Sequence, residues 1–394
     1  MANQISRVYG LQFGLLCLSS FMFFASFNMI IPELPDYLTS LGGEAYKGLI
    51  ISLFTLTAGL SRPFSGKLAD KIGRVPVMLL GSLVCIVASA LYPFTGSVVA
   101  FLLLRFLHGF STGFTPTGKS AYVADVVPLE KRGEAMGLMG LSGSLGMAAG
   151  PAIGSAVANH FSIDTMFYAS SIMAFLSVAI IAHMRETVKH PQPFRFSMLR
   201  LSRQEIIEPR VLAPCFVTFF TYFPYGIILT LIPDFSEHLG IQNKGIFFTC
   251  FTLASLAIRF LAGRASDKYG RVQVLVWSTL LLTLAMALLG MVESLAMLLA
   301  VGVLFGVANG MNSPTLYAWT IDLSHEAHRG RAMATMYIAL EAGIGIGALL
   351  SGWLYNNRPE NFPVVFWSGA AFALVAFIFM LFKIRSGRQL EELA

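Results

Sequence analysis

Long apolar stretches constrain the fold of this chain more than any other feature. A helix needs about 20 apolar residues to cross the hydrocarbon of a bilayer, whereas a membrane barrel would show alternating segments of about 10 residues, which are absent. The sequence is 56% hydrophobic and 12% charged, against about 25% charged residues in a typical soluble domain. We therefore predict an all-α integral membrane protein with twelve transmembrane helices, at approximately residues 10–36, 47–66, 75–95, 98–125, 133–158, 164–184, 211–235, 245–263, 272–291, 295–321, 331–355 and 363–383.

The basic residues lie mainly on one side of these predicted helices. Of the 27 lysines and arginines, twenty fall in the termini and the even-numbered connections, and only Lys47, Lys244 and Arg358 fall in the odd-numbered ones. The positive-inside rule therefore predicts that both termini are cytoplasmic. We expect a plasma-membrane protein, in the inner membrane if the cell is Gram-negative. The excess of basic residues on the cytoplasmic side then accounts for the pI of 9.2. No nucleic-acid partner is expected.

The chain is an internal repeat with an offset of 197 residues, half of its length. The nine residues from Gly66 to Arg74 recur from Gly263 to Arg271, and many other glycines and charged residues keep the same offset. We expect two six-helix bundles of equal orientation, residues 1–184 and 211–394, joined by a cytoplasmic linker at 185–210. Parallel repeats of this kind place a substrate site near the midplane, between the halves.

These motifs resemble those of the major facilitator superfamily. The GxLaDrxGR signature occurs twice, and the segments Arg105–Gly109 and Gly146–Gly154 resemble motifs of its twelve-helix branch of proton-coupled drug and metabolite exporters. His108 stands where that family often has Gln. The resemblance implies a monomeric transporter of a small-molecule substrate, with rocker-switch alternating access. It also implies that the antiporter-type motif of Gly146, Gly150, Pro151 and Gly154 faces the span 245–263 at the domain interface.

The duplicated signature predicts a cytoplasmic gate. Gly66 and Gly263 end their spans and would let two backbones approach closely. Arg74 is expected to pair with Asp125, and Arg271 with Asp322. Asp70 and Asp267 are expected in short loops, and the resemblance implies that each caps a helix of the other half.

Two further arginines precede the duplicated signature. Arg62 and Arg259 each lie one turn before the glycine of their copy. They either contribute to the inner gate or extend their charged ends to the membrane interface.

Ionisable residues within a span are costly, so each suggests a function. Glu341 is the deepest predicted carboxylate, and we expect it, with Arg105 and Glu33, to take part in proton coupling. The alternative for Glu341 is a static buried ion pair, and the alternative for Arg105 is structural hydrogen bonding to backbone carbonyls. Glu33 is expected nearer the outer surface, where desolvation is milder. Lys119 either attracts an anionic substrate or reaches the interface.

The resemblance implies a substrate cavity lined by polar and aromatic residues of the spans 10–36, 98–125, 211–235 and 295–321. The candidates are Asn28, His108, Tyr222, Tyr225, Asn309, Asn312, Thr315 and Tyr317. Asparagines in apolar spans also join helices by hydrogen bonds, so that alternative stays open for each of them.

Several activities have no motif here. The sequence lacks a phosphate-binding GxxxxGK[ST] loop, an HExxH or Cys/His zinc pattern, and a GxSxG turn, so we expect neither an enzyme nor a cofactor. The resemblance to proton-coupled exporters implies H+ as the coupling ion. The leading hypothesis is export of a drug-like compound or metabolite by proton antiport. The alternatives are a proton symporter or facilitator that takes up a sugar or other nutrient, and a transporter-like receptor without flux.

Overall fold

The computed structural model describes residues 10–127, 132–200, 207–324 and 329–392, and every regular element in those ranges is helical. Ten helices in them are long and apolar enough to cross a membrane, and the bent pair Ile246–Arg259 and Leu261–Tyr269 makes an eleventh. The helix Lys47–Ile72 falls outside this set, since Arg62 and the charges after it lower the hydropathy of its second half. The predicted all-helical membrane fold is confirmed.

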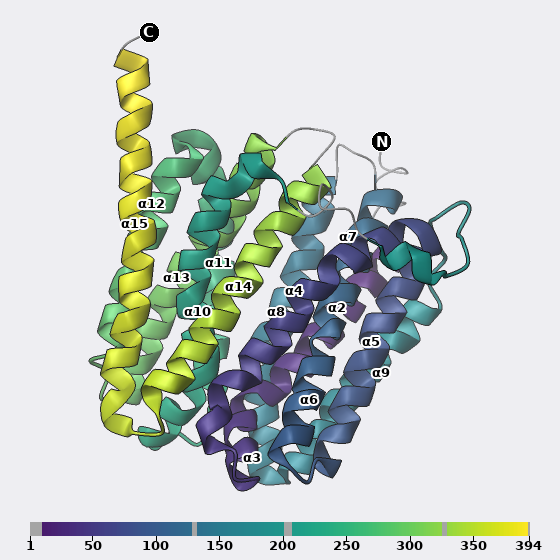
Figure 1. Ribbon diagram of the computed structural model, residues 1–394, viewed down its shortest axis with the longest axis horizontal. Helices are drawn as coiled ribbons and strands as arrows, with labels where there is room; N and C mark the ends of the chain where they lie inside the picture. Colours follow the sequence, from purple (N-terminus) through teal and green to yellow (C-terminus); the bar gives the residue numbers. More distant parts are fainter. Residues whose placement is uncertain (1–9, 128–131, 201–206, 325–328, 393–394) are drawn as a thin grey trace. The chain divides into compact units, whose positions relative to one another are not determined.

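The helices follow the predicted spans closely (Figure 1). Two predicted spans are each interrupted: the first by the 3-10 turn Ile31–Glu33, the fourth at Gly109. The elements of the first half are α2 (Leu11–Ile30), α3 (Leu34–Ser40), α4 (Lys47–Ile72), α5 (Arg74–Leu91), α6 (Val98–His108), α7 (Phe110–Val126), α8 (Arg132–His160) and α9 (Ile163–Ala182). Those of the second are α10 (Leu212–His238), α11 (Ile246–Tyr269), α12 (Arg271–Leu289), α13 (Leu295–Leu323), α14 (Arg329–Tyr355) and α15 (Phe362–Glu392).

The helices form two compact units. The first comprises residues 1–42 and 56–203, and the second comprises 43–55 and 204–394. The start of α4, through Thr55, therefore packs within the second unit, although the rest of α4 belongs to the first.

Helix packing repeats from one unit to the other. In the first unit α2 packs on α8 and α9, and α5 packs on α7 and α9. In the second, the helices one repeat later make the same pairs: α10 with α14 and α15, and α12 with α13 and α15. The offset of 197 residues therefore describes tertiary packing as well as sequence.

The duplicated signature is helical for longer than predicted. α4 and α11 continue through the motif and end only at Gly73 and Gly270, whose φ angles of 124° and 91° suit glycine. The prediction that Asp70 and Asp267 lie in loops is therefore wrong. Both stand in the last turn of a helix.

The reason predicted for Gly66 and Gly263 is also wrong for the described residues. A Cβ atom on either glycine would meet nothing within 4 Å there. No close backbone approach therefore requires glycine at these two positions in this structure.

Close helix approach occurs instead along α8. Gly146, Gly150 and Gly154 recur at every fourth residue and so share one face, which packs on the α2 backbone. The partner of this face within the first unit is α2, and the predicted contact with the span 245–263 stays a prediction. Pro151 lies inside α8.

Replacing Gly150 with Ala tests this packing. A Cβ atom there would lie 2.7 Å from the carbonyl oxygen of Ala25, and we expect a loss of about 1–3 kcal/mol of stability from overpacking. Gly140→Ala is the matched control in the same helix, because a Cβ atom there meets nothing within 4 Å. Thermal unfolding in detergent should show a lower Tm for Gly150→Ala alone. Equal Tm values for the two variants would contradict the close packing of α8 on α2.

Candidate functional site

An arginine lies between two carboxylates at the predicted cytoplasmic end of the first unit. Arg74 donates through Nη1 to Asp70 Oδ1 at 2.5 Å and through Nε to Asp125 Oδ2 at 3.0 Å. The last turn of α4, the start of α5 and the end of α7 each supply one member. The predicted pair of Arg74 and Asp125 is present, and Asp70 joins it as a third member.

The second unit repeats this triad. Arg271 donates through Nε to Asp322 Oδ2 at 2.9 Å, and its Nη1 bonds Asp267 and, at 2.7 Å, the hydroxyl of Ser266. Each guanidinium is thus neutralised within its own unit. The capping of a helix in the other half by Asp70 and by Asp267 stays a prediction.

Sequence reasoning missed Glu186, which ties the first triad to the chain after α9. Its carboxylate accepts the backbone N–H groups of Arg74 and Val75, each at 3.0 Å, and so caps α5. The Thr187 hydroxyl also donates to Asp125 at 2.6 Å. Glu186 stands among the basic residues of the predicted linker, where nothing local distinguishes it from a solvated charge.

Arg105 belongs to a buried polar network in the first unit. Its Nη1 donates to the Tyr92 hydroxyl at 3.2 Å, and this hydroxyl lies 3.1 Å from Nδ1 of His108. Nε2 of His108 lies 3.3 Å from the sulfur of Cys85. All four side chains are buried. His108 was predicted to line the substrate cavity, but both of its ring nitrogens contact neighbours inside the bundle.

The network continues through three hydroxyl groups. The Cys85 sulfur lies 3.4 Å from the Ser26 hydroxyl, and Ser26 in turn lies 3.2 Å from Ser170. Ser89 Oγ is 3.0 Å from Ser170 Oγ. A chain of polar contacts thereby joins side chains of α2, α5, α6 and α9.

Both predicted proton-binding carboxylates are buried. Glu33 lies between α2 and α3 and accepts a hydrogen bond from Ser155 of α8 at 2.5 Å. The expectation that Glu33 is only mildly desolvated is therefore wrong. Glu341 lies near the middle of α14 and is also buried. Their repeat mates are Thr230 and Ser144, so each acid is present in one copy alone.

Of the predicted cavity residues, several polar ones form hydrogen bonds and the tyrosines pack with other rings. Asn312 joins three helices of the second unit, since its amide donates to Thr221 at 2.9 Å and its carbonyl accepts from Ser278 at 3.4 Å. Its geometry is that of a residue that holds helices together. Asn28 and Thr315 bond backbone carbonyls of their own helices.

The aromatic candidates pack with other rings. Tyr222 lies 6.1 Å from Tyr225, and Tyr317 lies 5.9 Å from Tyr337, between ring centroids. Asn309 is partly exposed. A role in a cavity stays a prediction for these residues. Arg62 and Arg259 are also partly exposed, and their gate role stays a prediction.

A buried ion pair in the second unit was not predicted. Lys47, at the start of α4, lies 2.5 Å from Asp234 Oδ2, near the end of α10, and the Asp234 side chain is only 5% exposed. Beside it, a Cβ atom on Gly48 would lie 2.7 Å from the carbonyl of Ala348. The start of α4 is therefore held against α10 and α14. The two charges are 187 residues apart, so no local pattern connects them.

Removing one partner of this pair should destabilise the unit. Lys47→Met leaves the Asp234 carboxylate buried without its cation, which costs about 3–5 kcal/mol. Adding Asp234→Leu should recover most of that loss. Lys244 is the matched control: it is the repeat mate of Lys47, but its partner Glu237 is 62% exposed, so Lys244→Met should cost at most about 1 kcal/mol. Equal Tm losses for the two lysine variants would contradict the account.

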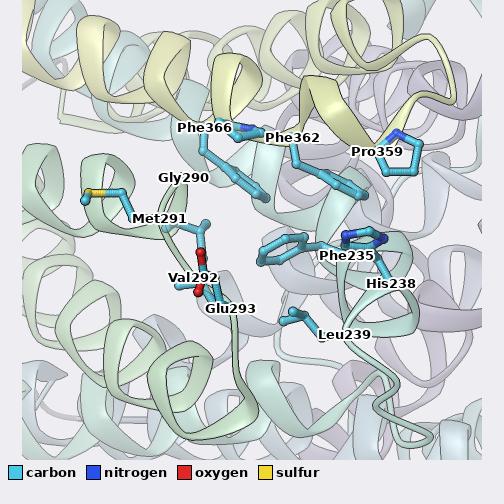
Figure 2. Close-up of a pocket in the computed structure, with 12 residues that line it drawn as sticks. Phe235, His238, Leu239, Gly290, Met291, Val292, Glu293, Pro359, Phe362 and Phe366 are labelled. Atoms are coloured by element: carbon cyan, nitrogen blue, oxygen red, sulfur yellow. The ribbon is translucent and has the colours of Figure 1, made fainter.

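A pocket of about 310 Å³ lies at the predicted outer end of the second unit (Figure 2). The end of α10, the end of α12 and the start of α15 form it, with the rings of Phe235, Phe362 and Phe366 and the imidazole of His238 on one side. These rings pack on one another at centroid distances of 4.9 to 6.4 Å. None of the predicted cavity residues lines this pocket.

Comparison with known proteins places these features in a family. The sequence matches the model of the Major Facilitator Superfamily twice, over residues 16–213 and 214–392. It is 24% identical over 386 residues to "Multi-drug resistance efflux pump PmrA" of Streptococcus pneumoniae, which covers 95% of this chain and 96% of the relative. It is 25% identical to "Multidrug resistance protein MdtG" of Dickeya zeae, with 93% of each chain covered.

A solved structure agrees on the fold. The crystal structure of a D-xylose-proton symporter superposes with a TM-score of 0.78 at 15% identity, over 93% of this chain and 96% of the other. The two family matches divide the chain as its internal repeat does and cover nearly all of it. The chain belongs to the major facilitator superfamily and is a multi-pass membrane transporter.

Proposed function

We propose that this transporter exports a small organic compound, drug-like or a metabolite, by proton antiport with alternating access. The observation that carries the proposal is the pair of Arg-centred triads at equivalent ends of the two units. Two relatives of nearly equal length are named as multidrug efflux or resistance proteins, which supports export. Both termini are proposed to be cytoplasmic, and the protein is proposed to act as a monomer in the plasma membrane.

The triads suit a gate because they are made and broken at moderate cost. Asp70 and Asp267 are about 70% exposed, so water can replace their ion pairs when a helix end moves. Each arginine joins the helices of the signature to α7 or α13. Opening and closing at this end would exchange such contacts between two states of similar free energy.

Glu341 and Glu33 suit proton coupling because burial disfavours a permanent negative charge. A carboxylate that is neutral on one side of the membrane and ionised on the other carries one proton per cycle. Arg105 stands in the buried network of the first unit, where its fixed positive charge can favour the ionised state of an acid that approaches it.

Glu341→Gln should abolish proton coupling while the protein stays folded, because Gln keeps the shape of the protonated acid. The substrate for this test is the compound that most raises the Tm of the purified protein in a library screen. In proteoliposomes, proton flux on its addition should disappear in Glu341→Gln. The exposed Glu360→Gln, at the predicted outer surface, is the control and should retain the flux. Full coupling in Glu341→Gln would remove this residue from the mechanism.

Arg74→Gln and Arg271→Gln should each slow transport of the same compound by about tenfold, which corresponds to about 1.4 kcal/mol lost from the state that the triads stabilise. Lys71→Gln, which removes a neighbouring charge of α4, should leave the rate within about twofold. Transport rates in proteoliposomes measure this. Unchanged rates in both arginine variants would show that the triads serve folding or topology alone.

The direction of transport separates export from the alternative of proton-coupled uptake. Counterflow of the same compound under imposed pH gradients of either sign gives the direction. Antiport is supported if the compound accumulates on the acidic side, from which protons leave, and uptake by symport if it accumulates on the alkaline side.

A further inference from the structure

Lys119 of α7 carries a buried amine that the mechanism above leaves unused. Its side chain is 1% exposed, and its Nζ has no hydrogen-bond partner among the described residues. A lysine that extends to the membrane interface keeps its ammonium group in water. That alternative is therefore wrong for Lys119, whose amine lies inside the first unit.

The surroundings of Lys119 are aromatic and apolar. Its Nζ lies 5.3 Å from the centroid of the Phe23 ring of α2, and Phe23 packs against Phe24 and Phe27 at 5.6 Å. In the part of the chain that the structure describes, Lys119 makes no ion pair. The site thus combines a buried amine that has no hydrogen-bond partner with a cluster of aromatic rings.

The internal repeat shows what the fold requires at this position. The repeat mate of Lys119 is Leu316, which is also 1% exposed, and the mate of Phe23 is Phe220. The scaffold therefore accepts a buried apolar side chain at the equivalent place in the second unit. The positive charge is an addition in the first copy, and packing does not explain it.

We propose that Lys119 is an anion-binding subsite of the transporter and that its substrates include small amphipathic organic anions. A buried ammonium group without a partner is unfavourable, and a carboxylate or sulfonate group on a ligand neutralises it with a charge-assisted hydrogen bond. The phenylalanines of α2 pack against an aromatic or apolar ligand body. Entry requires the Phe23 ring to move off the ammonium group. The inference names a substrate class and rests on the proposed export function for the direction of transport only.

Equilibrium binding of two fluorescent probes to the purified full chain tests the subsite. Dansyl sulfonate carries a permanent negative charge, and dansyl amide has the same rings without the charge. The wild type should bind the sulfonate at least about tenfold more tightly than the amide. Lys119→Leu, which installs the residue of the other repeat, should lose this preference and bind the amide as before.

Two further variants keep the test decisive. Lys119→Arg retains the charge and should keep sulfonate affinity within about threefold of the wild type. Lys383→Leu removes an exposed charge of α15 and should change neither affinity. The Tm of Lys119→Leu should not fall, since the second repeat already holds leucine there.

The outcomes separate this inference from the export proposal, because binding is measured without a gradient. Equal affinity of the wild type for both probes, or an undiminished sulfonate preference in Lys119→Leu, would overturn the subsite even if export is real. A Lys119-dependent preference for sulfonate supports the subsite even if no proton-coupled flux is found. If Lys119→Leu does not fold, the wild-type preference and its retention in Lys119→Arg still decide the question.

Discussion

The cost of placing a charge among apolar helices shapes the rest of this structure. In hydrocarbon, an ionised side chain needs a partner of opposite charge or a set of hydrogen bonds. Arg74 and Arg271 each receive two carboxylates from their own unit, and Lys47 receives Asp234. These pairs fix where helix ends meet, so the charges that mark topology in the sequence also position the helices.

The internal repeat separates scaffold from additions. The scaffold is what both copies hold: the Arg-centred triads, the helix pairs and the glycines that seat α8 on α2 and α14 on α10. The additions are ionisable residues whose mates are small, hydroxylic or apolar. Each lies buried in one copy, and the mate pairs are Glu33 and Thr230, Arg105 and Gly302, His108 and Phe305, Lys119 and Leu316, and Glu341 and Ser144. Because folding does not require these charges, they are the positions at which selectivity and coupling are expected.

Much of the fold could be predicted from the sequence, because long hydrophobic runs predict the membrane helices and the internal repeat predicts the symmetry between the two units. The pairs of Arg74 with Asp125 and of Arg271 with Asp322 followed from their positions at adjacent helix ends. The helix that packs on the α8 glycines could not be predicted, since spacing shows which residues share a face but not which helix covers it. Lys47 with Asp234, and Glu186 at the start of α5, depend on contacts over more than 100 residues, which no local pattern encodes.

The central claim is that the charged additions couple proton movement to export. The most direct measurement is proton flux in proteoliposomes of the purified protein, with the membrane potential clamped, when a compound that stabilises the protein is added to one side. Our account predicts that protons move opposite to the compound and that the flux needs a functional Glu341. Transport of the compound without proton movement, or with protons in the same direction, would contradict it.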